Sequence, residues 1–290
     1  MLLSIIIVNW NVKPLIERCL SSIFLFAKNL DYEILVVDNA SSDTSRGYLE
    51  ELAKNKKQLK VILNEKNLGF ARANNQAAKK AQGEFILFLN PDTEIRGGTL
   101  QKMVEFMKNN PDCGVAGCQM IGVDEKIQPS VRSFPSFGSQ VLIFLKLHHL
   151  FPFLPVVKRY FLSSFDYRKE QAVDQLMGAF FLTRRETMGE VGLFDEKFFT
   201  WFEEVDFCQR AKKANWQVIY TPKAQILHHG GESFKQVLSS KKQKIFNQSV
   251  IYYFKKHYPR YQSLVLEILN PFSLFLAYLN DLIYGIVARP

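Results

Sequence analysis

The sequence has few cysteines and no pattern among them. Its 290 residues include four, Cys19, Cys113, Cys118 and Cys208, without the spacing of a zinc site or a disulfide framework. We therefore expect reduced thiols in a cytosolic chain. The N-terminus lacks the basic stretch and cleavage site of a signal peptide, and its opening apolar run, 2–8, predicts a first core strand instead. Internal repeats and low-complexity tracts are also absent from the sequence.

Acidic residues are outnumbered, which leaves a net charge of +9 and an isoelectric point near 9.2. Such a charge permits nucleic acid, an anionic membrane surface or a phosphorylated ligand as partner. The sequence has no helix-turn-helix, zinc-finger or RNA-recognition motif, so we expect no nucleic-acid partner and favour the other two. Basic residues interleaved with aromatic ones in 241–260 indicate where such a surface lies.

Short apolar runs alternate with amphipathic segments over the first 121 residues, in the order typical of a parallel sheet with helical crossovers. The expected strands are 4–8, 34–37, 61–63, 85–89 and 114–121, and the expected helices are about 15–27, 44–54, 70–81 and 99–109. Right-handed crossovers then place the strand-end loops on one rim of the sheet. We expect the ligand site on this rim.

A stretch rich in proline, phenylalanine and basic residues, 122–172, interrupts this order and predicts an insert or lid. Its apolar part, 141–162, carries too many charges and prolines for a membrane-spanning helix and is better suited to an interfacial segment. Regular structure is expected to resume with a strand in 173–183, helices at about 184–191 and 204–214, and strands at about 217–220 and 224–228.

The last apolar run, 264–287, predicts a helix. Glu267, Pro271 and Asp281 interrupt every window long enough to span a bilayer. The sequence therefore favours an amphipathic surface helix or a docked terminal helix over a membrane span.

Two of the expected strands end in a carboxylate. Asp92 closes the tripeptide Asn-Pro-Asp at 90–92, where a carboxylate is well placed to hold a divalent cation against a phosphate. The same tripeptide is a common turn former. Asp38 ends the second strand, where an acidic residue either begins a turn or accepts hydrogen bonds from a ribose or a base. Together the two carboxylates suggest a nucleotide at one end of a site and its diphosphate at the other.

The expected helix 70–81 begins directly after a glycine. Asn67 and Gly69 precede it, and Arg72 and Asn75 lie one turn apart on it. A helix N-terminus favours a phosphate group. The amides can equally satisfy buried backbone groups, with Gly69 forming the loop.

The segment 201–210 is dense in acidic residues where a helix is expected to begin, with Glu203, Glu204 and Asp206. Acidic residues in a first helical turn commonly only favour the helix dipole. Flanking aromatic residues, however, exclude water and raise a carboxyl pKa toward that of a general base, and like-charged neighbours act in the same direction. We favour a catalytic role for this segment.

Two histidines, His228 and His229, end an expected strand ahead of a glycine-rich turn. Either imidazole is suited to bind a metal ion or a phosphate. Neighbours on a strand face opposite sides, so we expect one of the two to point away from any site.

The order of these motifs resembles family 2 glycosyltransferases of the GT-A fold, and most closely their bacterial rhamnosyltransferase-like branch. The matching stretches are IIIVNWN (5–11), VVDNASSD (36–43), NLGFARANN (67–75), LNPDTE (89–94), GLFDEKFFTWFEEVDFCQR (192–210) and HHGGES (228–233). The resemblance implies an α/β fold with a Rossmann-like, mostly parallel sheet flanked by helices, a hydrophobic insert and a C-terminal helical tail.

The resemblance also implies a division of the chain. A glycosyltransferase domain, 1–240, would comprise a nucleotide-binding half (1–121), an insert or acceptor-side lid (122–172) and an acceptor and catalytic half (173–240). The tail, 241–290, would be helical and associated with a membrane.

Roles for individual residues follow from the same resemblance. The nucleotide-sugar would be bound by Asn9, Asp38, Asn67, Gly69, Arg72, Asn75, Asn90 and Asp92. Asp38 would contact the base. Asp92 would be the metal-binding acid of the family's Asp-x-Asp element, whose first position is Asn90 here. The metal or the diphosphate would also be held by His228 or His229.

For catalysis, Glu204 takes the place of the family's general base, which is usually an Asp in a Glu-Asp pair. Glu203 and Asp206 flank it, so the resemblance leaves open which of the three acids is the base. A divalent metal, Mg²⁺ or Mn²⁺, would balance the charge on the leaving diphosphate, and the base would deprotonate the acceptor hydroxyl with inversion at the anomeric centre.

The implied function is transfer of a sugar, with rhamnose from dTDP-rhamnose as the first choice, to a hydroxyl of a lipid-linked or cell-surface glycan. The protein would act in the cytoplasm, bound peripherally to the inner face of the membrane. One alternative is a UDP-hexose or UDP-N-acetylhexosamine donor. An alternative of another class is a non-catalytic nucleotide-sugar binding or scaffold protein.

Overall fold

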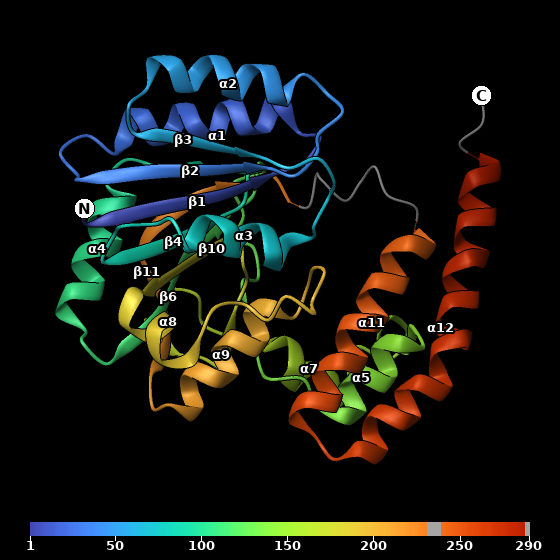
Figure 1. The fold of residues 1–290 in the computed structure, drawn as a ribbon. Coiled ribbons are helices and arrows are strands. Elements are labelled where there is room, and N and C mark those ends of the chain that lie inside the picture. Colours follow the sequence, from blue (N-terminus) through green and yellow to red (C-terminus); the bar gives the residue numbers. More distant parts are fainter. Residues whose placement is uncertain (231–238, 288–290) are drawn as a thin grey trace.

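A mixed sheet runs through the centre of the protein (Figure 1). The computed structural model describes residues 1–230 and 239–287, with side chains up to Leu282, so the end of the HHGGES motif (231–233) lies outside the described residues. The strands, in order across the sheet, are β3 (Leu59–Leu63), β2 (Tyr32–Asp38), β1 (Leu3–Asn9), β4 (Phe85–Leu89), β10 (Phe180–Arg184), β6 (Cys113–Ile121), β11 (Gln217–His228) and β5 (Thr93–Ile95), and β8 (Gln171–Ala172) pairs with β11.

The predicted, mostly parallel arrangement of the sheet is confirmed. β3, β2, β1 and β4 pair in parallel, and β11 is parallel to β6. β10 lies antiparallel between β4 and β6. It follows the insert rather than a helical crossover, so the crossover rule does not fix its direction. β11 is one strand, where two strands were expected. Its pairing with β6 shifts register between Thr221 and Gln225, next to Pro222, which has no N–H to donate.

Helices cover both faces of the sheet. The first face carries α1 (Lys13–Phe26), α2 (Ser45–Asn55) and α4 (Thr99–Asn109), and the second carries α3 (Phe70–Ala78), α8 (Arg185–Val191) and α9 (Glu203–Lys213). Alternate residues of β1 serve the two layers: Ile5 and Ile7 enter the first core, and Ile6 and Val8 enter the second. A strand buried on both faces reads as a continuous apolar run, which is why these strands were visible in the sequence.

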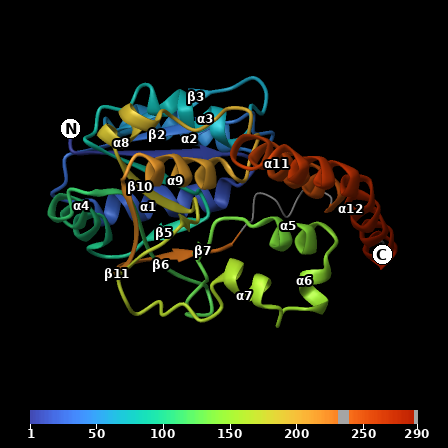
Figure 2. The ribbon, with the colours of Figure 1, turned by 90° about the horizontal axis from the view of Figure 1, so that it is seen from below.

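The insert and the C-terminal helices share a third core. The insert forms β7 (Val131–Arg132), which pairs with β9 (Gln175–Leu176), and the short helices α5 (Phe137–Phe144), α6 (Leu147–Leu150) and α7 (Pro155–Phe161). Beside them, α11 (Ser239–His257) and α12 (Arg260–Val287) lie against one another at one end of the molecule (Figures 1 and 2). Their core joins Phe144, Phe198, Phe202, Val205, Val250, Tyr253, Phe254 and Leu266. The C-terminal helices therefore pack on the segment that leads into α9.

One face of α12 is apolar and exposed. Its members are Tyr261, Leu264, Val265, Ile268, Phe272, Phe275, Leu276, Leu279 and Leu282. Among the described residues, Arg260–Leu282 has the length and apolar composition of a membrane span, and 22% of that window is buried in the protein.

Candidate functional site

A cleft of about 830 Å³ opens beyond the carboxyl ends of β1 and β4. Its lining is completed by the segment before α9, by residues 128–132 and 175–179, and by the first turns of α11. Seven of the predicted site residues line it: Asn67, Gly69, Asn90, Asp92, Glu203, Glu204 and His228. The strand-end rim predicted from the crossover pattern is thus where the cleft lies.

Asp92 and His228 form a buried pair on one wall of the cleft. Asp92 Oδ1 lies 3.6 Å from His228 Nε2, and both side chains are less than a tenth exposed. Burial lowers the pKa of His228 below its usual value despite the charge of Asp92, which leaves a neutral imidazole able to act as a ligand. One carboxylate oxygen and one imidazole nitrogen fit a divalent cation that takes its other ligands from a diphosphate. Within the described part of the chain, no group of three or more acidic, histidine or cysteine side chains could hold a metal alone.

His229 turns away from this pair, as expected for neighbours on a strand. Its Nε2 lies 2.8 Å from Glu94 Oε1, and its backbone N–H donates to the Asp92 carbonyl at 2.8 Å. His229 is not among the residues that line the cleft. Of the two histidines predicted as metal ligands, only His228 faces the cleft.

Glu203 and Glu204 line the same cleft from the first turn of α9. Burial and the charge of Glu204 raise the pKa of Glu203 well above its usual value. Burial also raises the pKa of Glu204, against the lowering effect of nearby backbone N–H groups and Arg132. Among the described residues, neither Oε2 atom has a hydrogen-bond partner. The pair, of which Glu203 is buried and Glu204 is half-buried, is therefore a basic carboxylate site that faces the cleft.

The chain reaches this acidic pair through two residues in an unusual backbone conformation. Trp201 and Phe202 have φ values of 63° and 71°, in the left-handed region that bulky side chains rarely adopt. Rings from α11 pack on both, with the Phe246 centroid 6.2 Å from that of Trp201 and 5.8 Å from that of Phe202. Such strain persists only where the surroundings enforce it. α11 thus helps to hold Glu203 in place.

Asp206, the third predicted acid, lies outside the cleft. It pairs with Arg210 Nε and Lys256 Nζ, each at 2.8 Å, and with His257 Nε2 at 2.7 Å. Burial alone would raise its pKa, but these partners lower it to about 2. A carboxylate of such low basicity that ties α9 to α11 is suited to stabilising the fold rather than to proton transfer.

Asn9 and Asp38 are buried behind the cleft rather than in it. Asn9 Nδ2 donates to Asp38 Oδ2 at 2.9 Å, and the Ser41 N–H donates to Asp38 Oδ1 at 3.0 Å. The next residue, Asn39, lines the cleft and bonds to Asn67 and to the Leu68 N–H. Sequence reasoning missed Asn39, although it directly follows a strand-end carboxylate that was singled out.

Gly69, Arg72 and Asn75 hold the segment that precedes α9. Asn75 Nδ2 donates to the Phe194 carbonyl at 2.8 Å, and Arg72 Nε lies 3.7 Å from Glu196 Oε2. At Gly69, with φ 84°, a Cβ atom would lie 2.5 Å from the Phe199 carbonyl oxygen. Because that oxygen also accepts from the first N–H of α3, the chain itself occupies the helix N-terminus that was expected to favour phosphate. Arg72 and Asn75 do not line the cleft.

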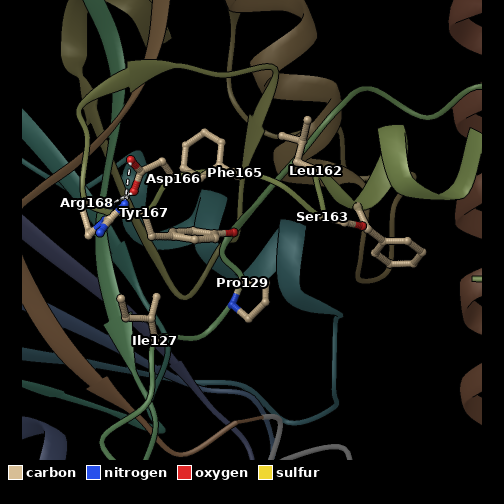
Figure 3. A pocket seen from close by; sticks show the side chains of 9 residues that line it. Ile127, Pro129, Leu162, Ser163, Phe165, Asp166, Tyr167 and Arg168 are labelled. Carbon is tan, nitrogen blue, oxygen red and sulfur yellow. Dashed lines mark hydrogen bonds and ion pairs between the residues drawn. The ribbon is translucent and has the colours of Figure 1, made fainter. Parts of the chain in front are cut away.

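A second cavity, of about 370 Å³, shares Pro129 with the cleft (Figure 3). Two of its polar side chains already have partners. Asp166 pairs with Arg168 at 2.9 Å, and the Tyr167 hydroxyl accepts from the Ser130 N–H at 3.0 Å. Of the sequence-predicted site residues, none lines this cavity.

An open sheet with Asp92 and His228 at its strand ends, and with Glu203 and Glu204 of α9 lining the same cleft, has the architecture of the GT-A class of glycosyltransferases. Comparison with known proteins agrees. Residues 4–192 match the family described as "Glycosyl transferase family 2", and the chain belongs to that family. The resemblance noted from the motifs, including its rhamnosyltransferase-like branch, is confirmed.

Individual relatives are similar over most of the chain. The N-acetylglucosaminyl-diphospho-decaprenol L-rhamnosyltransferase of Mycobacterium tuberculosis is 28% identical over 244 residues, which covers 80% of this chain and 77% of that protein. A mannosyltransferase from Pyrobaculum calidifontis, solved with GDP-Man and Mn²⁺, has a TM-score of 0.60 at 18% identity and covers 99% of this chain and 76% of its own. Staphylococcus aureus TarS 1–349, solved with UDP-GlcNAc, has a TM-score of 0.57 at 18% identity, with coverages of 91% and 69%. These solved structures support the fold.

Proposed function

We propose that the protein is a metal-dependent, inverting glycosyltransferase that moves a sugar from a nucleotide-sugar to a hydroxyl of a lipid-linked glycan. One observation carries the proposal: the Asp92–His228 pair and the Glu203–Glu204 pair line the same cleft. Displacement at an anomeric carbon needs positive charge at the leaving group and a base at the attacking hydroxyl. The cleft provides a place for both.

Asp92 and His228 would hold Mg²⁺ or Mn²⁺. When bound, the ion supplies positive charge that stabilises the departing diphosphate. The protein's own contribution is to present a carboxylate oxygen and a neutral imidazole nitrogen from two different segments at 3.6 Å. Asn90 lines the same wall and would contact the donor as a neutral hydrogen-bonding group.

Glu204 is the proposed base. Two neighbouring carboxyls that are shielded from water do not both ionise readily, and the charge of Arg132 favours the ionised form of Glu204. Glu203 then stays protonated. Glu204 accepts the hydroxyl proton while the hydroxyl oxygen bonds to the anomeric carbon and the bond from that carbon to the diphosphate oxygen breaks. Attack on the face opposite the leaving group inverts the anomeric centre.

The donor is proposed as dTDP-rhamnose, because the Mycobacterium tuberculosis relative is named as an L-rhamnosyltransferase. The lipid-linked acceptor rests on the same name, since that relative acts on an N-acetylglucosaminyl-diphospho-decaprenol. Two basic side chains that line the cleft, Arg132 and Lys241, suit an acceptor that carries a diphosphate. A UDP-sugar donor is the second candidate, since the TarS neighbour was solved with UDP-GlcNAc.

A panel of dTDP-, UDP- and GDP-sugars, each with Mg²⁺ or Mn²⁺ and read as nucleotide release, tests the donor and the metal together. Asp92→Ala and Glu204→Gln are each expected to lower the rate by about 10²–10⁴-fold. Matched changes at exposed acids, Asp112→Ala and Glu50→Gln, are expected to leave it unchanged. Full activity in both site variants would overturn the catalytic proposal and favour a binding or scaffold role.

We also propose that α12 rests on the inner face of the cytoplasmic membrane. Its exposed apolar face extends over several turns, and the neighbouring segment 241–260 is rich in basic residues. Flotation with vesicles containing anionic lipid tests this placement. The double variant Ile268→Glu and Phe272→Glu should lose binding at low salt, whereas Val123→Glu, an equally exposed apolar site on a loop, should keep it.

A further inference from the structure

We infer that Gln128 is a positioning residue that fixes both the orientation and the tautomer of His228. The inference rests on the proposed function, because it concerns how His228 is presented to the cation. It comes from the start of the insert, a segment in which the sequence singled out no individual residue.

The turn after β6 brings Gln128 back against the end of β11. The Gly122 N–H donates to the Lys126 carbonyl at 2.8 Å, and the Gln128 N–H donates to the Met120 carbonyl at 2.8 Å. β11 lies alongside β6 in parallel, with Leu227 opposite Ile121. Gln128 therefore faces the last residue of β11, which is His228. Both side chains line the cleft.

Two hydrogen bonds join Gln128 to His228. Gln128 Nε2 donates to the His228 carbonyl oxygen at 3.0 Å, and Gln128 Oε1 lies 2.7 Å from His228 Nδ1. One amide thus bonds to both the backbone and the ring of the same histidine. The two bonds together restrict rotation of the His228 ring about its side-chain bonds.

The direction of these bonds fixes the position of the imidazole proton. A carbonyl oxygen only accepts, so the amide nitrogen of Gln128 must face the His228 backbone. The amide oxygen then faces Nδ1 and also only accepts, so Nδ1 must carry the proton. In the neutral ring this leaves the lone pair on Nε2, the atom that faces Asp92.

The arrangement presents two electron-pair donors to one another across 3.6 Å. This distance exceeds a hydrogen bond, and two ligands that each lie about 2.1 Å from a common ion fit within it. A neighbour that orients a ligating imidazole in this way typically contributes 10- to 100-fold to metal affinity. Gln128→Leu removes both bonds at similar side-chain volume, and Gln128→Glu keeps an acceptor for Nδ1 while losing the donor to the carbonyl.

The test combines nitrogen NMR of the histidine rings with Mn²⁺ titration of the full chain in the presence of dTDP, and of UDP in parallel. At pH 8 the signal of His228, identified by its absence in His228→Asn, is expected to show Nδ1 protonated and Nε2 bare. We expect Gln128→Leu to lose this preference and to bind Mn²⁺ 10- to 100-fold more weakly, and Gln128→Glu to retain the tautomer and most of the affinity. Gln101→Leu is the matched control, because Gln101 also donates to a backbone carbonyl, that of Phe26, but lies away from the cleft.

A proton on Nε2 in the wild type would overturn the inference, as would Mn²⁺ affinity in Gln128→Leu equal to that of the wild type. Failure of the proposed function looks different. In that case the wild type itself would bind no Mn²⁺ with either dTDP or UDP, while the tautomer would still be set by Gln128.

Discussion

Replacing Gly69 by alanine is expected to disable the cleft through the backbone. Gly69 has φ 84° and ψ 169°, a combination that is essentially restricted to glycine and costs other residues about 1–3 kcal/mol. The new Cβ would also lie 2.5 Å from the Phe199 carbonyl oxygen and 2.8 Å from the Phe199 ring. Overpacking of this kind costs about another 1–3 kcal/mol. We therefore expect Gly69→Ala to destabilise the protein by about 2–6 kcal/mol, as the sum of these costs.

Part of this strain would be relieved by moving the Phe199 segment away from α3. That segment leads directly into Glu203 and Glu204, so a protein that remains folded should still lose transferase activity. Urea unfolding at 25 °C measures the first effect, and nucleotide release with the active donor measures the second.

The control is Gly47→Ala on α2, where an added Cβ meets nothing within 4 Å. Relief of the glycine entropy cost should stabilise this variant by about 0.5–1 kcal/mol and leave activity intact. If the free energy of unfolding of Gly69→Ala also lies within about 0.5 kcal/mol of the wild-type value and the variant keeps full activity, the close contact of Gly69 with Phe199 does not constrain the site.

Three further predictions concern Glu203, Asp206 and the aromatic ring that packs at the start of α9. Glu203→Gln should be more stable than the wild type at pH 8 and equal to it near pH 4. A carboxyl whose pKa is raised by folding costs stability once the pH exceeds the pKa that it has in the unfolded chain. Thermal unfolding at both pH values measures this, and a stability difference that does not change with pH would contradict the raised pKa. Asp206→Asn should lower the free energy of unfolding by about 2.5 kcal/mol at pH 7, which is the equivalent of lowering a pKa from 3.8 to about 2. This loss of stability should become smaller as the pH falls from 4 toward 2. An unchanged free energy of unfolding would show that the ion pairs with α11 contribute nothing. Phe246→Ala should lower kcat at least tenfold with the donor KM unchanged. The change frees the strained Phe202 next to Glu203 but does not touch Asp92 or His228. A raised KM with a normal kcat would show that Phe246 supports donor binding instead.

The N-terminal half of the fold was predictable because its signals are local. Strands buried on both faces read as apolar runs, and a helical crossover fixes a parallel neighbour. The antiparallel β10 was not predictable in direction, because it follows the insert and its place between β4 and β6 is set by contacts far away in the sequence.

The same contrast holds for the site. Sequence reasoning singled out Asp92, Glu204 and His228 because they lie at strand ends and a helix start, and the topology brings these positions to one cleft. Gln128 gave no signal, because a single glutamine in an irregular stretch becomes meaningful only through a partner 100 residues away. Arg72 and Asp206 were singled out for residue types that suit chemistry, but they lie outside the cleft and form ion pairs with the segment before α9 and within α9.

The third core has a consequence for shortened versions of the chain. Removing α11 and α12 to obtain a less apolar protein would uncover Phe198 and Phe202 and withdraw the ring that confines the left-handed Phe202. The sheet and the Asp92 wall have their own cores and would survive such a cut. The expected product is a protein that still recognises the nucleotide but has no fixed base. Donor binding by a truncated chain would therefore be a poor guide to whether the enzyme is whole.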